Sequence, residues 1–253
     1  MKSVYCIFVS LLLLCCSNPP SAETFLKEGV PLALAEYRSE QVSNVKYGLA
    51  FKIPEQKEAP ISAVLKLKLD ISNLDAPLLL DFKEESNLLK SLKTNGNKCE
   101  IFHQNEHLKI SPDHLKVGTN EIEIEFTMGE LSLNRNDEYL YTLLVPDRAR
   151  TLFPCFDQPN IKAKYTLTIT APNDWQVLSG ALEKRTSQNG DFTIHEFGTT
   201  DTMSTYLFSF VSGKFQKASE SRDNFDMTLL YRENDSAKID LSLPKFLIRT
   251  GNL

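Results

Sequence analysis

The sequence has 253 residues, of which 42% are hydrophobic, and it carries a formal net charge of −5 with a pI near 5.5. This length is enough for one large domain with a substantial core. The acidic balance disfavours nucleic acid as a partner, because nucleic-acid binding depends on Lys and Arg contacts to phosphates. The absence of G-x-S-x-G and G-x-G-x-x-G motifs gives no support for a serine hydrolase or a dinucleotide-binding site.

The first residues have the pattern of an export signal. A basic start at Lys2 runs into an apolar stretch over residues 6–16 that only Ser10 interrupts. This stretch is shorter than the roughly 20 apolar residues that span a bilayer. We therefore expect residues 1–15 to be a signal peptide that directs export, either to a bacterial cell envelope (periplasm or outer membrane) or into the medium.

The cleavage site has two interpretations. Leu13–Ser17 resembles a lipobox, in which Cys16 becomes the lipid-modified N-terminus and residues 16–28 form a tether to the membrane. The match is imperfect, because Cys15 stands where Gly, Ala or Ser is usual. The alternative is cleavage after Ala22, which leaves a soluble protein.

Alternating apolar and polar residues dominate the middle of the chain, as is typical of strands with one solvated face. Three stretches show the pattern most clearly: residues 64–71, 121–126 and 165–170. Their charged faces, such as Lys66 and Lys68, are interpreted as the wet side of an antiparallel sheet. Further strands are expected at residues 45–53, 78–82, 99–103, 108–111, 175–179, 192–197, 206–215 and 225–231.

Helix is scarce, with short segments expected only at residues 31–38 and 84–93. Many short strands separated by turn residues predict an all-β fold: a large antiparallel, multi-sheet or β-sandwich domain, saddle-like, with one or two short helices. We place this single domain at residues 29–235. Residues 236–253 are interpreted as the start of a truncated linker, because the sequence stops there without a cap or closing strand.

The most distinctive segment follows a strand that begins at Tyr139. Residues 149–163 read ARTLFPCFDQPNIKA, a loop with two prolines and the rings of Phe153 and Phe156 close to them. The rings can anchor the loop by burial, and Arg150 and Asp157 can form an ion pair. From these residues alone, the segment is a well-fixed loop between two strands.

This segment closely resembles the A-R-x-x-F-P-C-F-D-x-P-x-x-K-A stretch of the aminopeptidase N family, zinc peptidases of the gluzincin type. The similarity extends to residues 132–137, 175–179 and 204–208, so it covers about residues 30–245. In that family the stretch lies in the N-terminal β domain, facing the catalytic domain. The resemblance implies a domain that forms one wall of the cleft in which single residues are removed from peptide N-termini.

Two positions depart from the family pattern. Many members carry a Gln and, two residues later, a Glu that help to hold the free α-amine of the substrate. The resemblance places Leu143 and Val145 at these positions, and neither side chain can accept a hydrogen bond. We interpret Leu143 and Val145 as residues that line the wall of the substrate pocket. The α-amine clamp must then come from carboxylates elsewhere in the enzyme, or this is a divergent subfamily with altered specificity.

The family's zinc motifs are absent from the sequence. Neither H-E-x-x-H nor G-x-M-E-N occurs, so we expect no catalytic residue, metal ligand or cofactor in this chain and zinc in a missing catalytic domain. The expected partners are that catalytic domain in cis, peptide substrates through the complete enzyme, and a membrane through the possible lipid anchor. Cys99 and Cys155 can form a bridge, but we expect free, buried thiols.

Three histidine segments imitate metal motifs. His103, Glu106 and His107 spell H-x-x-E-H, the inverted zinc-peptidase signature, which requires a helix. The flanking alternation instead predicts a β-hairpin with its turn at residues 104–106. His195-Glu196 lacks a second His four residues after His195, and His114 has no partner in the sequence.

These observations leave two hypotheses. The first is the N-terminal domain of an exported zinc aminopeptidase, without the zinc site and inactive by itself. The second is a lipid-anchored β domain that stands alone and binds peptides or a protein partner without catalysis.

Overall fold

The computed structural model describes residues 25–222, 225–235 and 237–239. The predicted signal peptide at residues 1–15, the candidate lipid anchor Cys16 and most of the predicted tether and linker lie outside the described residues. In the part of the chain that is described, no helix is long and apolar enough to cross a membrane.

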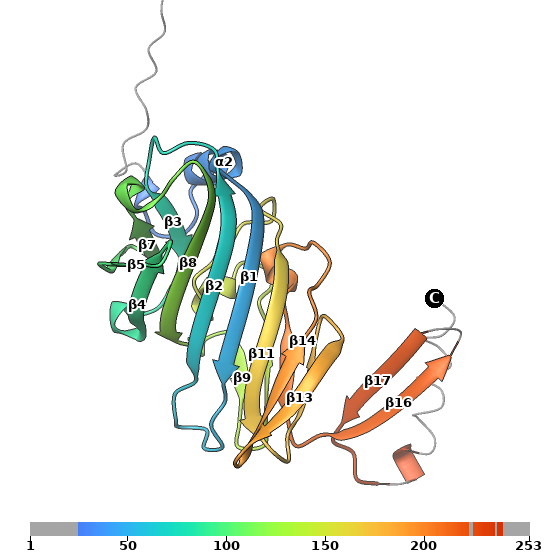
Figure 1. Cartoon of the computed structure of the whole chain (residues 1–253). Helices are drawn as coiled ribbons and strands as arrows, with labels where there is room; N and C mark the ends of the chain where they lie inside the picture. The colour runs from blue at the N-terminus through green and yellow to red at the C-terminus, as the bar shows by residue number, and fades with distance from the viewer. Residues whose placement is uncertain (1–24, 223–224, 236, 240–253) are drawn as a thin grey trace, which may run out of the picture.

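An eight-stranded sheet forms one complete layer of the domain (Figure 1). Its long central strands alternate as the sequence predicts, with the apolar residues of each facing inward. In spatial order the strands are β13 (Glu183–Asn189), β14 (Phe192–Phe197), β11 (Lys164–Pro172), β1 (Val42–Lys52), β2 (Ser62–Ile71), β8 (Gly118–Thr127), β4 (Leu89–Thr94) and β5 (Asn97–Cys99).

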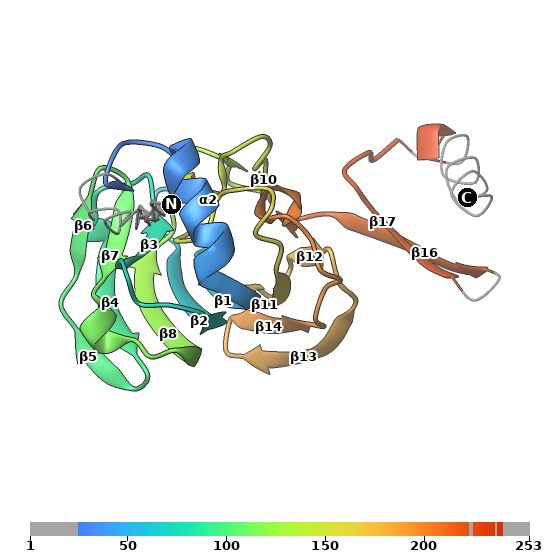
Figure 2. The same cartoon turned by 90° about the horizontal axis from the view of Figure 1, so that it is seen from above.

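Two smaller sheets lie behind this layer, as the view from above shows (Figure 2). One contains β12 (Gln176–Ser179), β15 (Phe210–Gly213), β10 (Tyr139–Thr142) and β9 (Leu133–Arg135), and the other β3 (Leu78–Asp81), β7 (His107–Ile110) and β6 (Phe102–Gln104). Phe51 stacks on Phe210 across the first interface, and Phe82 packs edge-on against Phe126 across the second. The predicted all-β, multi-sheet architecture is confirmed.

One strand pair is parallel rather than antiparallel. β1 and β11 run side by side over Lys46↔Lys164 to Lys52↔Thr170, at the centre of the large sheet. They lie more than 100 residues apart in the sequence, so a long connection with many intervening strands joins them. Alternation within a strand carries no information about the direction of its neighbour, which is why the sequence did not reveal this pair.

The last strand pair stands apart from the layered body in both views (Figures 1 and 2). Among the strands that the structure describes, β16 (Gln216–Arg222) and β17 (Phe225–Tyr231) pair only with each other. The guanidinium of Arg232 lies 4.1 Å from the ring centre of Tyr139 and so holds the end of this hairpin to the sandwich. The predicted domain end at residue 235 stays a prediction.

The helix α2 (Leu32–Gln41) corresponds to the first predicted helix and caps one end of the sandwich. The second predicted helix, at residues 84–93, is wrong. Residues 86–88 form a single 3-10 turn, and β4 follows it. Leu89 and Leu92 have a helix-like spacing because a β-bulge between Leu89 and Ser91 allows both leucines to face the core.

Some predicted strands are shorter or divided. The segment 99–103 is split between β5 and β6, which belong to different sheets. The segment 206–215 begins as the 3-10 turn η4 (Thr205–Leu207) and is a strand only in β15. The edge strand β13 was not predicted. Its seven residues are all polar and exposed, so the sequence shows no alternation of apolar and polar residues there.

Candidate functional site

Leu143 and Val145 lie at the surface, directly after β10. Their exposed fractions are 57% and 62%, whereas Leu144 between them is 2% exposed. The alternation of β10 explains this arrangement, since Leu140 and Thr142 also face the core. The backbone N–H of Leu143 donates to the carbonyl of Ser132 at 2.9 Å, which fixes this segment beside the end of β9.

A third exposed apolar residue extends this surface. Leu131 precedes Ser132 and is 72% exposed. We call Leu131, Leu143 and Val145 the apolar wall. A shallow hollow of about 310 Å³ lies on the same four-stranded sheet and is lined in part by Tyr141 and Leu178. Adjacent exposed apolar residues of this kind mark interaction surfaces more often than scattered ones do.

The loop that follows the apolar wall is anchored by its aromatic rings. Phe153, Cys155 and Phe156 are fully buried. The ring of Phe153 packs edge-on against Tyr47, and the Tyr47 hydroxyl accepts a hydrogen bond from the Phe156 N–H at 3.0 Å. The sequence-based prediction of a loop fixed by ring burial is confirmed.

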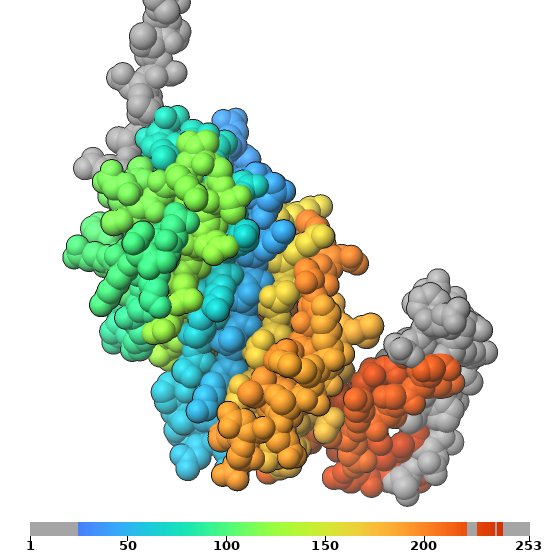
Figure 3. Space-filling model, in the orientation of Figure 1, coloured from blue at the N-terminus to red at the C-terminus, as the bar shows by residue number. Residues whose placement is uncertain are grey.

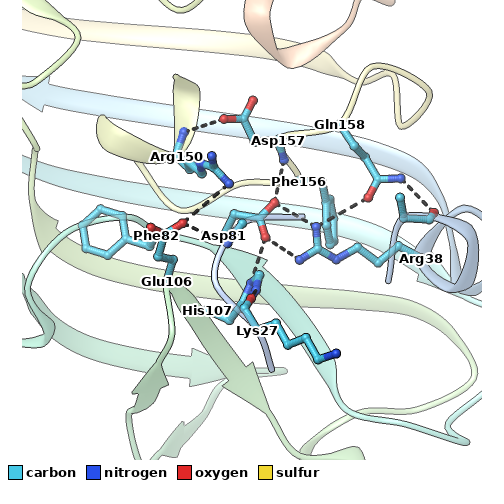
Figure 4. Close-up of polar contacts among 12 residues, drawn as sticks. Lys27, Arg38, Asp81, Phe82, Glu106, His107, Arg150, Phe156, Asp157 and Gln158 are labelled. Carbon is cyan, nitrogen blue, oxygen red and sulfur yellow. Dashed lines mark hydrogen bonds and ion pairs between the residues drawn. The ribbon is translucent and has the colours of Figure 1, made fainter. Parts of the chain in front are cut away.

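A buried carboxylate, Asp81, holds the loop in place (Figure 4). Its oxygens accept two hydrogen bonds from the Arg38 guanidinium, at 2.5 and 2.8 Å, and a third from the Asp157 N–H at 2.9 Å. Nδ1 of His107 lies 2.9 Å from the same carboxylate. The backbone of Asp81 also pairs in both directions with Cys155. Asp81 therefore joins helix α2, strand β7 and the loop.

The charges of this cluster balance despite complete burial of Asp81 and Arg38. Burial raises the pKa of Asp81, but Arg38 and the contact with His107 outweigh that effect and lower it to about 2. Gln158 supports the pair by donating to the Ala35 carbonyl at 3.0 Å, which links the loop to helix α2 a second time. Buried hydrogen-bonded networks of this kind fix one arrangement of the surrounding elements.

Asp157 behaves in the opposite way. Burial raises its pKa to about 6, with a further contribution from the nearby charge of Asp81. Its carboxylate accepts a hydrogen bond from the backbone N–H of Arg150 at 3.1 Å. The expected ion pair between the side chains of Arg150 and Asp157 is not formed. The Arg150 guanidinium instead bonds to Asp147 at 3.0 Å and lies 3.6 Å from Glu106.

Asp157→Asn is expected to stabilise the protein at neutral pH. The folded-state pKa is raised above 3.8, so the ionised carboxylate costs stability above about pH 6 and none below about pH 4. At pH 7.5 the gain should be about 2 to 3 kcal/mol, because asparagine still offers an oxygen to the Arg150 N–H. Urea unfolding at pH 4, 5, 6 and 7.5 measures it, with the exposed Asp201→Asn as control. A gain that does not change between pH 4 and pH 7.5 would contradict the assignment.

The H-x-x-E-H segment forms the predicted hairpin, with positive φ at Asn105 and Glu106 in its turn. Its two imidazoles contact different partners. His103 bonds through its two ring nitrogens to Ser86 and to the Phe82 carbonyl, each at 2.8 Å. His107 reaches Asp81 and the Lys27 carbonyl. The two histidines and Glu106 therefore do not form a zinc ligand set.

Glu106 and its neighbours instead hold the N-terminal segment. Glu106 accepts the Gly29 N–H at 3.1 Å and pairs with Lys83 at 2.8 Å. Asn105 donates to the Leu26 carbonyl at 2.8 Å. Together with the His107–Lys27 contact, these bonds attach residues 26–29 to the hairpin tip.

The remaining histidines and cysteines form no cluster either. His195 lies in β14 and pairs with Glu183 at 2.6 Å, and His114 is exposed in a 3-10 turn. Cys99 and Cys155 are free and buried, and burial raises the pKa of the Cys155 thiol well above its usual value. Throughout residues 25–222, 225–235 and 237–239, no group of three His, Cys, Asp or Glu side chains is placed to hold a metal ion.

Fold and site together define a β-sandwich domain that presents a rigid loop and an apolar wall. Comparison with known proteins gives this class its family. The peptidase M1 N-terminal domain profile matches residues 46–207, which include the wall and the loop. The chain belongs to the peptidase M1 N-terminal domain family.

Individual relatives agree with this assignment. Human aminopeptidase N is 38% identical over 80 residues, 30% of this chain and 8% of the relative. A probable M1 family aminopeptidase 1 of Encephalitozoon cuniculi is 34% identical over 114 residues, 42% of this chain and 13% of the relative. A probable aminopeptidase 1 of Sulfurisphaera tokodaii is 29% identical over 141 residues, 52% and 17% respectively. The match thus spans less than a fifth of each of these relatives.

Sequence reasoning singled out the loop, and also Leu143 and Val145, whose place at the substrate pocket stays a prediction. It missed Arg38, Asp81 and Leu131. Asp81 and Arg38 are 43 residues apart, and no local pattern connects them. One signal was available: Asp81 interrupts the apolar stretch 78–82, where a charged residue is unusual.

Proposed function

We propose that this chain is the N-terminal domain of an exported zinc aminopeptidase, and that its apolar wall lies at the substrate cleft formed with a catalytic domain. The observation that carries this proposal is the apolar wall beside the loop at residues 149–163, which we call the signature loop. The family match covers both. Exposure of Leu131, Leu143 and Val145 is costly for an isolated surface and is explained if a second domain or a substrate covers them.

The proposed role of the domain is to shape the pocket for the N-terminal residue of a peptide. It supplies no zinc ligand, because its histidine side chains point to different partners and do not converge on one site. The metal and the reacting water therefore belong to the catalytic domain. By itself the chain then has no peptidase activity. Export and a lipid anchor at Cys16 are part of the same proposal and rest on the sequence pattern of residues 1–22.

The direct test uses the purified chain. With one equivalent of zinc, we expect neither stoichiometric zinc binding nor hydrolysis of leucine p-nitroanilide. The polypeptide encoded directly downstream should contain H-E-x-x-H and should co-purify with this chain when both are expressed together. Turnover by the purified chain, or a downstream sequence without this motif, would reject the proposal. Peptide binding by this chain without turnover would then favour a stand-alone binding domain.

The assembled enzyme allows a sharper prediction about specificity. The double variant Leu143→Gln/Val145→Glu introduces an acceptor and a carboxylate where the wall is apolar. If the wall borders the substrate's N-terminus, KM for unblocked aminoacyl anilides should fall by about tenfold, as expected for a hydrogen bond to a charged group. Leu182→Gln, which alters another exposed leucine elsewhere on the surface, is the control. An unchanged KM in the double variant would place the wall away from the α-amine.

A further inference from the structure

The outer face of the eight-stranded sheet carries an unusual arrangement of lysines. This face is turned toward the viewer in Figure 3, with β1 and β2 in blue and cyan and β11 in yellow. Lys46 and Gly48 on β1 point outward, as do Lys66 and Lys68 on β2. Lys164 and Thr166 continue the same two rows on β11.

The strand register places these lysines next to one another. Lys46 pairs directly with Lys164 on one side and with Lys68 on the other. Directly opposed residues have Cβ atoms about 5 Å apart, and like charges in such positions destabilise a sheet. Three lysines therefore share a row that spans about 10 Å, two strand spacings.

Few carboxylates neutralise the row. Lys68 pairs with Glu121 at 2.9 Å. Among the described residues, Lys46, Lys66 and Lys164 form no ion pair with a carboxylate. The nearest acidic groups are already engaged: Asp70 accepts hydrogen bonds from Thr119 and Asn44, and Glu123 pairs with Lys93 at 2.8 Å.

Gly48 has no side chain, so the surface of the sheet is open between these lysines. It pairs with Lys66 on one side and Thr166 on the other. A Cβ at this position would lie 3.4 Å from the Thr166 hydroxyl oxygen, so the hydroxyl borders the open floor. A neighbouring hollow of about 590 Å³ is lined by Lys66, Lys68 and Lys93, together with Glu121 and Glu123. We call Gly48 and its surrounding Lys46, Lys66, Lys68, Lys164 and Thr166 the basic floor.

We propose that the basic floor binds a phosphate-bearing ligand. A phosphate group carries the charge that the unpaired amines lack, and its oxygens accept hydrogen bonds from ammonium and hydroxyl groups. A cluster of directly opposed lysines is unexpected on a chain whose net charge is −5. Features that break such local rules of stability occur where function requires them. On the β8 side of the floor, Glu121 pairs with Lys68 and Glu123 with Lys93, which leaves Lys46, Lys66 and Lys164 as the amines without a carboxylate partner among the described residues.

The first experiment measures binding of tripolyphosphate by calorimetry at low and moderate salt. We expect saturable binding that weakens as salt rises. The double variant Lys46→Gln/Lys164→Gln should bind about fivefold more weakly or worse, the sum of two exposed ion pairs. The control Lys57→Gln/Lys217→Gln makes the same charge change at exposed positions outside the eight-stranded sheet and should bind as the wild type does. Absence of saturable binding, or equal weakening in both double variants, would overturn the proposal.

A second variant separates a shaped site from diffuse attraction. Gly48→Thr keeps every charge, suits a strand, and fills the floor. It should weaken tripolyphosphate binding while leaving the urea unfolding midpoint unchanged or slightly higher. Wild-type affinity in this variant would overturn the proposed site.

Binding to lipid vesicles distinguishes a lipid headgroup from a soluble phosphate ligand. Sedimentation with phosphatidylglycerol vesicles, compared with phosphatidylcholine vesicles, tests lipid headgroups. Binding to the anionic vesicles that Gly48→Thr weakens supports a lipid phosphate, whereas tripolyphosphate binding without vesicle binding supports a soluble phosphate ligand. The proposal is independent of peptidase function, because the basic floor and the apolar wall lie on different sheets.

Discussion

Asp81→Ala is expected to destabilise the domain by about 3 to 5 kcal/mol, the usual cost of removing one partner of a buried ion pair. The substitution leaves the guanidinium of Arg38 buried without a countercharge and removes the acceptor of the Asp157 N–H. Urea unfolding, followed by the fluorescence of the single tryptophan, Trp175, measures the change. Asp201→Asn, at an exposed position, should change stability by less than about 0.5 kcal/mol.

A double-mutant cycle shows whether the loss arises from the pair. Arg38→Met combined with Asp81→Leu replaces both charges with apolar groups, and such replacements are often close to neutral. The double variant should therefore lose less stability than the two single variants added together. Additive losses would show that Arg38 and Asp81 act separately.

The Arg38–Asp81 cluster also predicts how the stability of the fold changes at acidic pH. The folded-state pKa of Asp81 lies at about 2, below its ordinary 3.8, so its contribution is fully present above about pH 4. That contribution is lost as the pH falls from about 4 through 2. Asp81 thus stabilises the folded state above about pH 4, whereas the ionised Asp157 costs stability increasingly between about pH 4 and 6. The combined contribution of these two groups is therefore greatest near pH 4.

Phe153→Ala is expected to cost about 3 to 5 kcal/mol, the typical range for emptying a buried aromatic site. Phe153 is fully buried and packs edge-on against both Tyr47 and Phe208. Its ring therefore joins the signature loop to β1 and to the segment before β15. The measurement is again urea unfolding at pH 7.5.

Two further variants make this result interpretable. Phe153→Leu keeps most of the apolar volume and should cost less than the alanine variant. Phe102→Ala removes a ring that is 45% exposed and lies 5.0 Å from the Lys109 amine, which is worth about 0.5 to 1 kcal/mol. Equal losses at Phe153 and Phe102 would contradict the view that ring burial fixes the loop.

The sequence by itself determined the fold class and most of the strands. Period-two alternation at residues 64–71 and 121–126 reflects a single physical requirement, one buried and one wet face, and it needs no knowledge of neighbours. The same reasoning correctly predicted a β-hairpin at His103–His107. The signature loop was also readable, because rings and prolines at fixed positions specify a local structure.

Only the tertiary structure decided how distant segments meet. The parallel pair β1–β11, the pairing of residues 89–94 with β8 across a bulge, and the Arg38–Asp81 pair each depend on residues far apart in the chain. The basic floor has the same origin, since Lys46, Lys68 and Lys164 become neighbours only through the register of three strands. Local patterns encode which side of an element is buried, whereas pairing and register are set by long-range packing.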